Sequence, residues 1–267
     1  MISPLAHVHP NAKIGENTTI EPFAYIQEDV VIGDNCHIHA HASILDGARI
    51  GNNCAIHGAA VISGTPQDLK YKGEKTTATI GNNTIIRECA TVNKGTAARG
   101  NTQIGNNTLI MAYTHVGHDC VVGNNCILVN RVSLAGEVEI DDFAILGGHV
   151  AVHQFSKIGT HSMISGGTLV NKDVPPYVKC AHTPIAYVGL NTIGLRRRAF
   201  TSEQILEIQQ ISKILFQSSL NYNIGCDKVL AEVPQSHFRD EIVNFIKNSK
   251  RGILKPYQPK SNNDDID

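Results

Sequence analysis

Aliphatic residues recur at every sixth position over most of the chain. An amphipathic helix would repeat its apolar face about every 3.6 residues, and a half-buried strand would alternate every two. A period of six therefore predicts a parallel β-helix, in which each hexapeptide forms one short strand and one corner. Three runs keep a single phase: Ile2, Val8, Ile14, Ile20, Ile26, Ile32, Ile38, Ile44, Ile50, Ile56 and Ile62; Ile80, Ile86 and Val92; and Ile104, Ile110, Val116, Val122, Leu128, Leu134, Ile140, Leu146, Val152, Ile158, Ile164 and Val170.

Small residues occupy a second fixed position, four residues after many of the aliphatic ones, where they fit near a corner. The tripeptide Gly-Asn-Asn often follows the aliphatic residue, as at residues 51–53 and 105–107. Glycine and asparagine tolerate the positive φ angles that tight corners require. Tiling by hexapeptides predicts a three-sided prism, so one complete coil takes 18 residues.

The repeat extends over residues 1–175, with two interruptions at residues 63–79 and 97–103. Both interruptions rejoin the phase, so they are predicted to be loops extruded from corners. Loops on a rigid scaffold commonly carry function, and neutral insertions are the alternative. The repeat stops at Val174-Pro175-Pro176-Tyr177, because proline cannot continue a central strand.

Residues 176–257 are predicted to form a connector and a small helical domain. Thr201 and Gln204 have the spacing of a capping box, and an apolar helical face follows them. A second helix is expected to begin near Ser236. These helices would cover the open end of the prism, whose backbone groups would otherwise be unpaired. The polar tail at residues 258–267 is predicted to be disordered.

The bulk composition narrows the class of protein. The formal net charge of −1 argues against nucleic-acid binding. No apolar stretch approaches the ~20 residues of a membrane span, and no signal peptide is visible. The seven cysteines include no CxxC pair, and four occupy the small-residue position. They are interpreted as buried, reduced thiols of a cytoplasmic protein.

Three of the thirteen histidines alternate along the chain, at His37, His39 and His41. This spacing suggests a zinc site, because histidine-rich tracts often bind metals. No nearby cysteine or carboxylate completes a ligand set in the sequence. Exposed corner residues are therefore the favoured interpretation.

A more specific pattern surrounds residue 118. His118 precedes Asp119, and a carboxylate beside an imidazole can fix its tautomer for general-base chemistry. Gly136 lies one coil further and Gln154 two coils further, so the three should stack about 4.8 Å apart along one edge. A base beside a bare glycine N–H, which would bind an oxyanion, predicts acyl transfer. The alternative is that Gly136 is only a corner glycine.

A dense basic run, Arg196-Arg197-Arg198, precedes the first long predicted helix. Such a run would bind a phosphate group or an acidic partner. A solvated start of the helix accounts for it equally well.

Six motifs occur in a fixed order: Gln67-Asp68-Leu69-Lys70-Tyr71, His115-Val116-Gly117-His118-Asp119-Cys120, Gly147-Gly148, Val152-His153-Gln154-Phe155, Val174-Pro175-Pro176-Tyr177 and Gly194-Leu195-Arg196-Arg197-Arg198. With these motifs the chain resembles the UDP-N-acetylglucosamine O-acyltransferases, which begin lipid A synthesis in Gram-negative bacteria. The resemblance extends to about residue 257. Other hexapeptide acyltransferases share the repeat but not this set of insertions.

The resemblance implies an all-β, left-handed parallel β-helix with a small α-helical C-terminal domain. It also implies a cytoplasmic homotrimer whose active sites lie in clefts between neighbouring subunits. Members of the family move a 3-hydroxyacyl chain from acyl carrier protein to the glucosamine 3-hydroxyl of UDP-GlcNAc. No cofactor or metal is expected, and neither is a nucleic-acid partner or stable membrane insertion.

The same resemblance assigns roles to individual residues. His118 is the expected general base, Asp119 its orienting partner and Gly136 the oxyanion donor. The expected substrate-binding residues are Asp68, Lys70, His115, His153 and Gln154 for the sugar nucleotide and acyl chain, Asn191, Arg197 and Arg198 for the nucleotide end, and Gly166 for the acyl chain length.

The chain departs from the family pattern at three positions. Glu137 and Asn93 stand where the family has site histidines, and Ile193 stands where it has a nucleotide-contacting glutamate. These departures leave open a 3-amino sugar as the acceptor. The sequence is also compatible with a trimeric zinc carbonic anhydrase, with a non-catalytic solenoid, and with the related N-acyltransferase of the same pathway, which carries an additional N-terminal domain.

Overall fold

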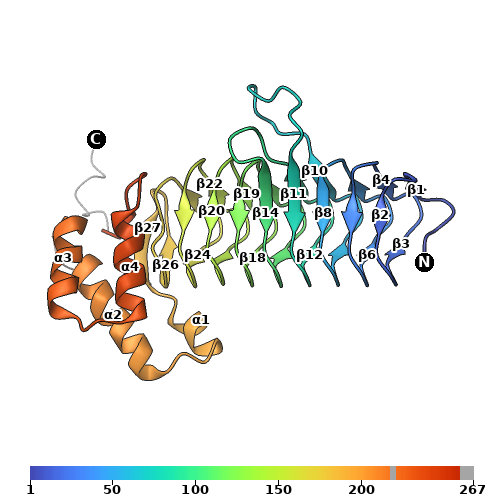
Figure 1. Ribbon diagram of the computed structural model, residues 1–267. Helices are drawn as coiled ribbons and strands as arrows, with labels where there is room; N and C mark the ends of the chain where they lie inside the picture. Colours follow the sequence, from blue (N-terminus) through green and yellow to red (C-terminus); the bar gives the residue numbers. More distant parts are fainter. Residues whose placement is uncertain (217–220, 259–267) are drawn as a thin grey trace, which may run out of the picture.

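The computed structural model describes residues 1–216 and 221–258 (Figure 1). Short strands coil into a prism with three sheets, in which the strands of successive coils pair in parallel, and helices follow at its C-terminal end. Only β26 and β27, after the last coil, pair antiparallel among the paired strands described. The expected fold, a left-handed parallel β-helix with a small helical C-terminal domain, is confirmed.

Each sheet forms one side of the prism. Sheet 1 contains β1 (His7–Val8), β4 (Tyr25–Ile26), β7 (Ser43–Ile44), β10 (Val61–Gly64), β13 (Thr91–Asn93), β16 (His115–Val116), β19 (Ser133–Leu134), β22 (Ala151–Val152) and β25 (Leu169–Val170). Sheet 2 contains β2 (Lys13–Ile14), β5 (Val31–Ile32), β8 (Ala48–Ile50), β11 (Thr77–Ile80), β14 (Asn101–Ile104), β17 (Val121–Val122), β20 (Glu139–Ile140) and β23 (Lys157–Ile158). Sheet 3 contains β3 (Thr19–Ile20), β6 (His37–Ile38), β9 (Ala55–Ile56), β12 (Ile85–Ile86), β15 (Leu109–Ile110), β18 (Ile127–Leu128), β21 (Ile145–Leu146), β24 (Met163–Ile164), β26 (Val178–Ala181), β27 (Ala186–Leu190) and β28 (Lys255–Pro256).

The repeated aliphatic residue is the inward one of each strand. In sheet 3, Ile110 pairs with Leu128, and Leu128 pairs with Leu146. All three side chains are fully buried. Burying an aliphatic side chain of this size contributes roughly 1.5–3 kcal/mol. The preceding residue of each strand points outward, so each strand offers one position to the surface.

The corner between sheets 2 and 3, which we call the asparagine corner, satisfies its backbone through side chains. Asn125 adopts a φ of 56°, in the left-handed region that asparagine tolerates. The N–H of Asn106 donates to Asn124 Oδ1 of the next coil at 2.8 Å, and the N–H of Asn124 donates to Asp142 Oδ1 at 2.6 Å. Each coil therefore anchors its neighbour.

The corner between sheets 1 and 2, which we call the site corner, carries both loop insertions. One loop spans residues 65–76 between β10 and β11, and the other spans residues 94–100 between β13 and β14. Figure 1 shows both projecting from the same side of the prism. The longer loop is shorter than the interruption at residues 63–79 suggested, because the flanking strands β10 and β11 extend to four residues each. The other loop lies three residues earlier than the interruption at residues 97–103, because β13 ends at Asn93 and β14 starts at Asn101.

The C-terminal part contains α1 (Thr192–Arg197), α2 (Ser202–Phe216), α3 (Tyr222–Glu232) and α4 (His237–Lys247) within the described residues. The capping box predicted before α2 is present, since Thr201 N–H donates to Gln204 Oε1 at 2.8 Å and Gln204 N–H donates to Thr201 Oγ1 at 3.3 Å. Ser236 caps α4 as expected, by accepting from the N–H of Arg239 at 3.0 Å.

The predicted disordered tail lies outside the described residues, except for residue 258. Over residues 1–216 and 221–258, none of the helices has the length and apolar character needed to cross a membrane.

Candidate active site

Three positions of the site corner lie on successive coils, as their 18-residue spacing predicted. They are His118, Gly136 and Gln154, which follow the paired strands β16, β19 and β22. The N–H of Glu137 donates to the carbonyl of His118 at 2.9 Å, and the N–H of Phe155 donates to the carbonyl of Gly136 at 3.3 Å. The backbone of the three coils is therefore in register at this edge.

The imidazole of His118 lies directly over Gly136. A Cβ atom built on Gly136 would sit 2.4 Å from His118 Nε2 and 2.5 Å from its Cε1. Real Cβ atoms do not approach other atoms so closely, so any side chain at position 136 would push the ring away. Only glycine allows the ring and the backbone of the next coil to meet here.

The backbone N–H of Gly136 also differs from its counterparts at the asparagine corner. There, the N–H of the middle corner residue donates to an asparagine or aspartate side chain of the next coil, as Asn106 does to Asn124. The N–H of Gly136 has no such acceptor: no side chain or carbonyl within residues 1–216 and 221–258 accepts a hydrogen bond from it. This N–H without a protein partner and the His118 ring thus lie side by side at the site corner, both largely buried.

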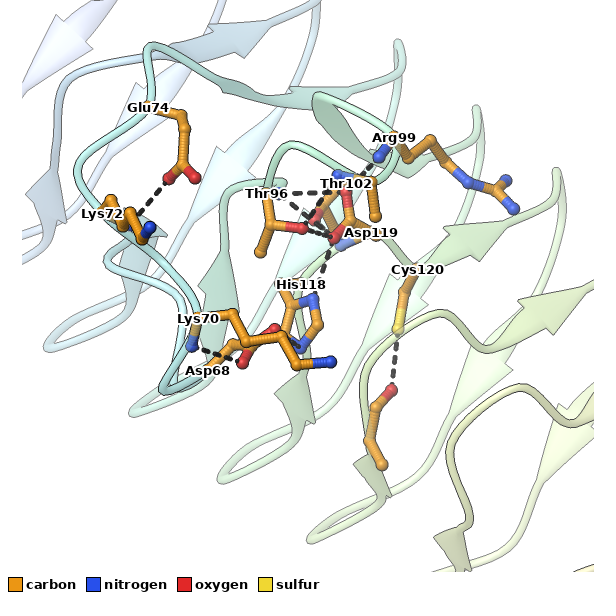
Figure 2. Close-up of polar contacts among 12 residues, drawn as sticks. Asp68, Lys70, Lys72, Glu74, Thr96, Arg99, Thr102, His118, Asp119 and Cys120 are labelled. Carbon is orange, nitrogen blue, oxygen red and sulfur yellow. Dashed lines mark hydrogen bonds and ion pairs between the residues drawn. The ribbon is translucent and has the colours of Figure 1, made fainter.

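Asp119 holds the other side of the His118 ring. His118 Nδ1 and Asp119 Oδ2 form a hydrogen bond of 2.9 Å, and the Asp119 side chain is fully buried. The carboxylate also accepts from Thr96 Oγ1 at 2.6 Å, from the Thr96 N–H at 3.0 and 3.1 Å, and from the Arg99 N–H at 3.2 Å. The loop at residues 94–100 therefore wraps around this carboxylate (Figure 2).

The electrostatic balance at Asp119 favours its charged form. Burial tends to raise the pKa of Asp119, but the hydrogen bonds from Thr96 and His118 outweigh burial and keep the pKa below its ordinary value. An ionised Asp119 accepts the Nδ1 proton of His118. The neutral ring then leaves Nε2 as its acceptor nitrogen.

The longer loop, residues 65–76, brings a second carboxylate to the same ring. Asp68 Oδ2 lies 4.0 Å from His118 Nε2, and its Oδ1 accepts from the Lys70 N–H at 2.9 Å. Figure 2 shows the ring between Asp119 on one side and Asp68 on the other. The longer loop thus contacts the His118 ring directly, whereas the loop at residues 94–100 acts on it through Asp119.

The other histidines of this region lie on or beside sheet 1. His115 forms a 2.7 Å hydrogen bond with Thr91 Oγ1 through its Nδ1. Burial, and then the nearby His118, lower the pKa of His115, so its neutral form is favoured. His153 is exposed, and its Nδ1 lies 3.1 Å from the Gln154 carbonyl.

The residues expected at the nucleotide end lie elsewhere in this chain. Asn191 is buried, accepts from the Gly194 N–H as the N-cap of α1, and donates to the His161 carbonyl at 2.9 Å. The Arg198 guanidinium lies 5.1 Å from the centre of the Phe143 ring, at the asparagine corner. Arg197 beside it is exposed.

Gly166, expected at the acyl chain end, lies at the corner between sheets 3 and 1. A Cβ atom there would meet the Gly148 carbonyl at 3.0 Å. The expected site residues of a single chain are thus distributed over all three corners. The expected base, oxyanion donor and sugar-binding residues lie at or beside the site corner, and the remaining expected residues lie at the two other corners.

Sequence reasoning missed Thr96, the residue that makes the most hydrogen bonds to Asp119. The only signal for it was the second interruption of the repeat. The structure also locates the departures from the family pattern. Asn93 is buried at the base of the longer loop and donates to the Thr65 carbonyl at 3.0 Å, and Ile193 is 68% exposed on α1.

A β-helix of hexapeptides with a histidine–aspartate pair on its edge is typical of the hexapeptide-repeat acyltransferases. Comparisons with known proteins support this class. The family model described as bacterial transferase hexapeptide (six repeats) matches residues 101–136, and the model described as UDP-N-acetylglucosamine O-acyltransferase, domain 2, matches residues 173–254.

Individual relatives indicate one family within this class. The acyl-[acyl-carrier-protein]–UDP-N-acetylglucosamine O-acyltransferase of Nautilia profundicola is 44% identical over 202 residues, which covers 75% of this chain and 77% of the relative. The crystal structure of LpxA, a UDP-N-acetylglucosamine acyltransferase from Bacteroides fragilis, is 53% identical with a TM-score of 0.94 and covers 96% of this chain and 100% of that chain. The Francisella novicida enzyme is 42% identical with a TM-score of 0.93, over 97% and 95% of the two chains. The chain belongs to the UDP-N-acetylglucosamine O-acyltransferase family.

The buried Asp119 gives a pH-dependent contribution to stability. Because its folded pKa is lowered, this contribution is present above about pH 4 and is lost as the pH falls through the folded pKa. Asp119→Asn keeps a residue that tolerates the φ of 59° here, and it should lower the free energy of unfolding by about 1–3 kcal/mol at pH 7.

Denaturant titrations from pH 7 to pH 3 measure the difference between the wild type and this variant. The difference should shrink below about pH 4. A difference that stays constant over this range would show that ionised Asp119 does not stabilise the fold.

Proposed function

We propose that this protein transfers a 3-hydroxyacyl chain from acyl carrier protein to the 3-hydroxyl of UDP-GlcNAc, the first step of lipid A biosynthesis. Relatives that are 41–45% identical carry the name acyl-[acyl-carrier-protein]–UDP-N-acetylglucosamine O-acyltransferase. The observation that carries the proposal is the imidazole of His118 lying over the bare Gly136. This pair places a base and an oxyanion donor close enough together to act on the same attacking hydroxyl and acyl carbonyl.

The proposed reaction begins with proton transfer to His118. Its Nε2 takes the proton of the sugar 3-hydroxyl while that oxygen attacks the thioester carbonyl carbon of the acyl donor. The Gly136 N–H donates to the oxygen that becomes negative in the tetrahedral intermediate. The carbon–sulfur bond then breaks, and the leaving thiolate takes the proton from the imidazolium.

Asp119 acts on this step through His118. Its ionised carboxylate holds the Nδ1 proton, so the ring presents Nε2 to the substrate. It also stabilises the imidazolium that forms when Nε2 is protonated. The buried hydrogen bonds from Thr96 keep the carboxylate in place during both stages.

Asp68 and Lys70 are assigned to sugar-nucleotide binding. The Asp68 carboxylate faces the same nitrogen of His118 that takes the proton, so the acceptor sugar must approach between them. Lys70 lies in the same loop and supplies a positive charge. His115, His153 and Gln154 extend the polar surface along sheet 1 and its corner, where they would line the sugar and the acyl chain.

The distribution of residues over three corners supports a homotrimer. In a threefold assembly of prisms, the site corner of one subunit would face another corner of its neighbour. Arg197, Arg198 and Asn191 would then contact the nucleotide end, and Gly166 would border the acyl chain, from a neighbouring subunit. We assign the protein to the cytoplasm, where acyl carrier protein supplies the thioester.

A transfer assay tests the function directly. The purified protein is incubated with UDP-GlcNAc and a panel of 3-hydroxyacyl carrier proteins of different chain lengths, and the products are read by mass spectrometry. A mass increase of one 3-hydroxyacyl group on UDP-GlcNAc is expected. A parallel reaction contains the 3-amino analogue of UDP-GlcNAc, and transfer to this analogue alone would show that the acceptor is an amine and not the 3-hydroxyl. Failure to bind either UDP-GlcNAc or acyl carrier protein would favour a non-catalytic solenoid.

Replacing the proposed base should abolish most of the activity. We expect His118→Ala to lower kcat by ~10²–10⁴-fold, the range of general-base catalysis. Steady-state kinetics gives the value, and nucleotide binding with an unchanged oligomeric mass serves as the control. Near-normal turnover by intact oligomers would rule out His118 as the base.

The arginine run should act on binding rather than on bond making. We expect Arg198→Ala to raise KM for UDP-GlcNAc about 10-fold with little change in kcat, since a charged hydrogen bond contributes about 1.5–3 kcal/mol. Arg196→Ala removes the same charge two residues earlier, where the side chain is exposed, and should leave KM unchanged. Equal KM values for both variants and the wild type would contradict the assignment of Arg198.

A further inference from the structure

A second group of titratable side chains lies on the N-terminal coils, away from His118. Glu21 follows β3, His37 lies in β6 and His39 follows β6, in the region of the first coils in Figure 1. Glu21 Oε1 lies 2.6 Å from His37 Nε2 and 3.3 Å from His39 Nδ1. Among the residues that the structure describes, these form the one group of at least three potential metal ligands whose ligand atoms all lie within 4.8 Å of one another.

The arrangement corrects one expectation from the sequence. No carboxylate was apparent near the alternating histidines, yet the coil register brings Glu21 from the preceding coil beside them. His41, the third of the alternating histidines, is not part of the group. Its ring stacks on Phe23, with 5.2 Å between the ring centroids.

The donor atoms match the requirements of a borderline-soft divalent ion. Zinc is bound by imidazole nitrogens and carboxylate oxygens at about 2.0–2.2 Å, usually in tetrahedral geometry. Two ligands of such an ion are separated by about 3.3 Å. The 3.3 Å separation of Glu21 and His39 already fits, and a small rotation would lengthen the 2.6 Å contact of Glu21 and His37.

Neighbouring groups hold these ligands in place. The second oxygen of Glu21 accepts from the Ala40 N–H at 2.9 Å, which orients the carboxylate. The rings of His37 and His39 stack with 3.9 Å between centroids, and the ring of His57 continues the stack at 4.3 Å. Binding of an ion would therefore require one of the two ligand rings to tilt out of the stack, so that both nitrogen lone pairs converge. The three ligand side chains are 27–44% exposed, so an ion can reach them from solvent.

We propose that Glu21, His37 and His39 form a binding site for a divalent transition-metal ion of the zinc type. Glu21 comes from one coil and both histidines come from the next, so the ion would join two coils by coordinate bonds. Coils near the end of a solenoid have fewer neighbours to stabilise them, and a bound ion would resist their fraying. The site is separate from the acyl-transfer site and does not take part in that reaction.

Titration calorimetry with Zn²⁺ on the full chain, after dialysis against a chelator, tests this proposal. One ion per chain is expected, and Co²⁺ should bind with the intense visible absorption of tetrahedral coordination. Glu21→Gln and His39→Ala should each weaken Zn²⁺ binding at least ~10-fold. His41→Ala, a change in the same alternating series, should bind as the wild type does.

Two further measurements keep the test decisive. His37→Gln preserves a hydrogen-bonding side chain and the fold but removes the imidazole ligand, so it should also lose the ion. Zn²⁺ should raise Tm of the wild type and not of these variants, while transfer activity stays unchanged in all of them. The absence of stoichiometric binding, or binding that persists in Glu21→Gln and His39→Ala, would overturn the site.

Discussion

The parallel register of 18 residues per coil is the constraint on which the rest of the structure depends. It stacks equivalent positions of successive coils along each edge, as the pairing of Ile110, Leu128 and Leu146 shows in the core. The same register places His118 over Gly136 at the surface. The proposed catalytic geometry and the core packing therefore arise from one repeat, and a shift of the coils would disrupt both.

The insertions add chemistry without disturbing that register. Val61 pairs with Thr91 and Thr91 pairs with His115, so the coils rejoin after each loop. The loop at residues 94–100 buries and fixes Asp119, and the loop at residues 65–76 brings Asp68 to the exposed side of the same ring. A rigid prism thus positions the histidine, and the loops define its surroundings.

Much of the fold followed from the sequence, because the inward position of each short strand is filled by an aliphatic side chain and the position near the corner by a small one. The stacking of His118 on Gly136 followed from the same count of 18 residues. The contact of Thr96 with Asp119 did not, because it depends on the path of a loop that has no repeat. Helix α3 was also missed, since few of its residues, such as Cys226 and Val229, are buried.

The contact of Glu21 with the alternating histidines could have been predicted from its spacing in the sequence. Glu21 and His39 are 18 residues apart, the same interval that relates His118 to Gly136. The carboxylate partner of a histidine in a solenoid need not be its neighbour in sequence, because the fold brings together residues one coil apart. In such folds, the coil interval is the more informative distance.

The most direct test of the proposed catalytic geometry is the turnover of Gly136→Ala together with its crystal structure. If the imidazole must lie against a bare backbone, the added methyl group will displace the His118 ring and lower kcat by ~10²-fold or more, while the β-helix and the oligomeric mass stay intact. A variant with wild-type kcat and an undisplaced ring would contradict the central claim.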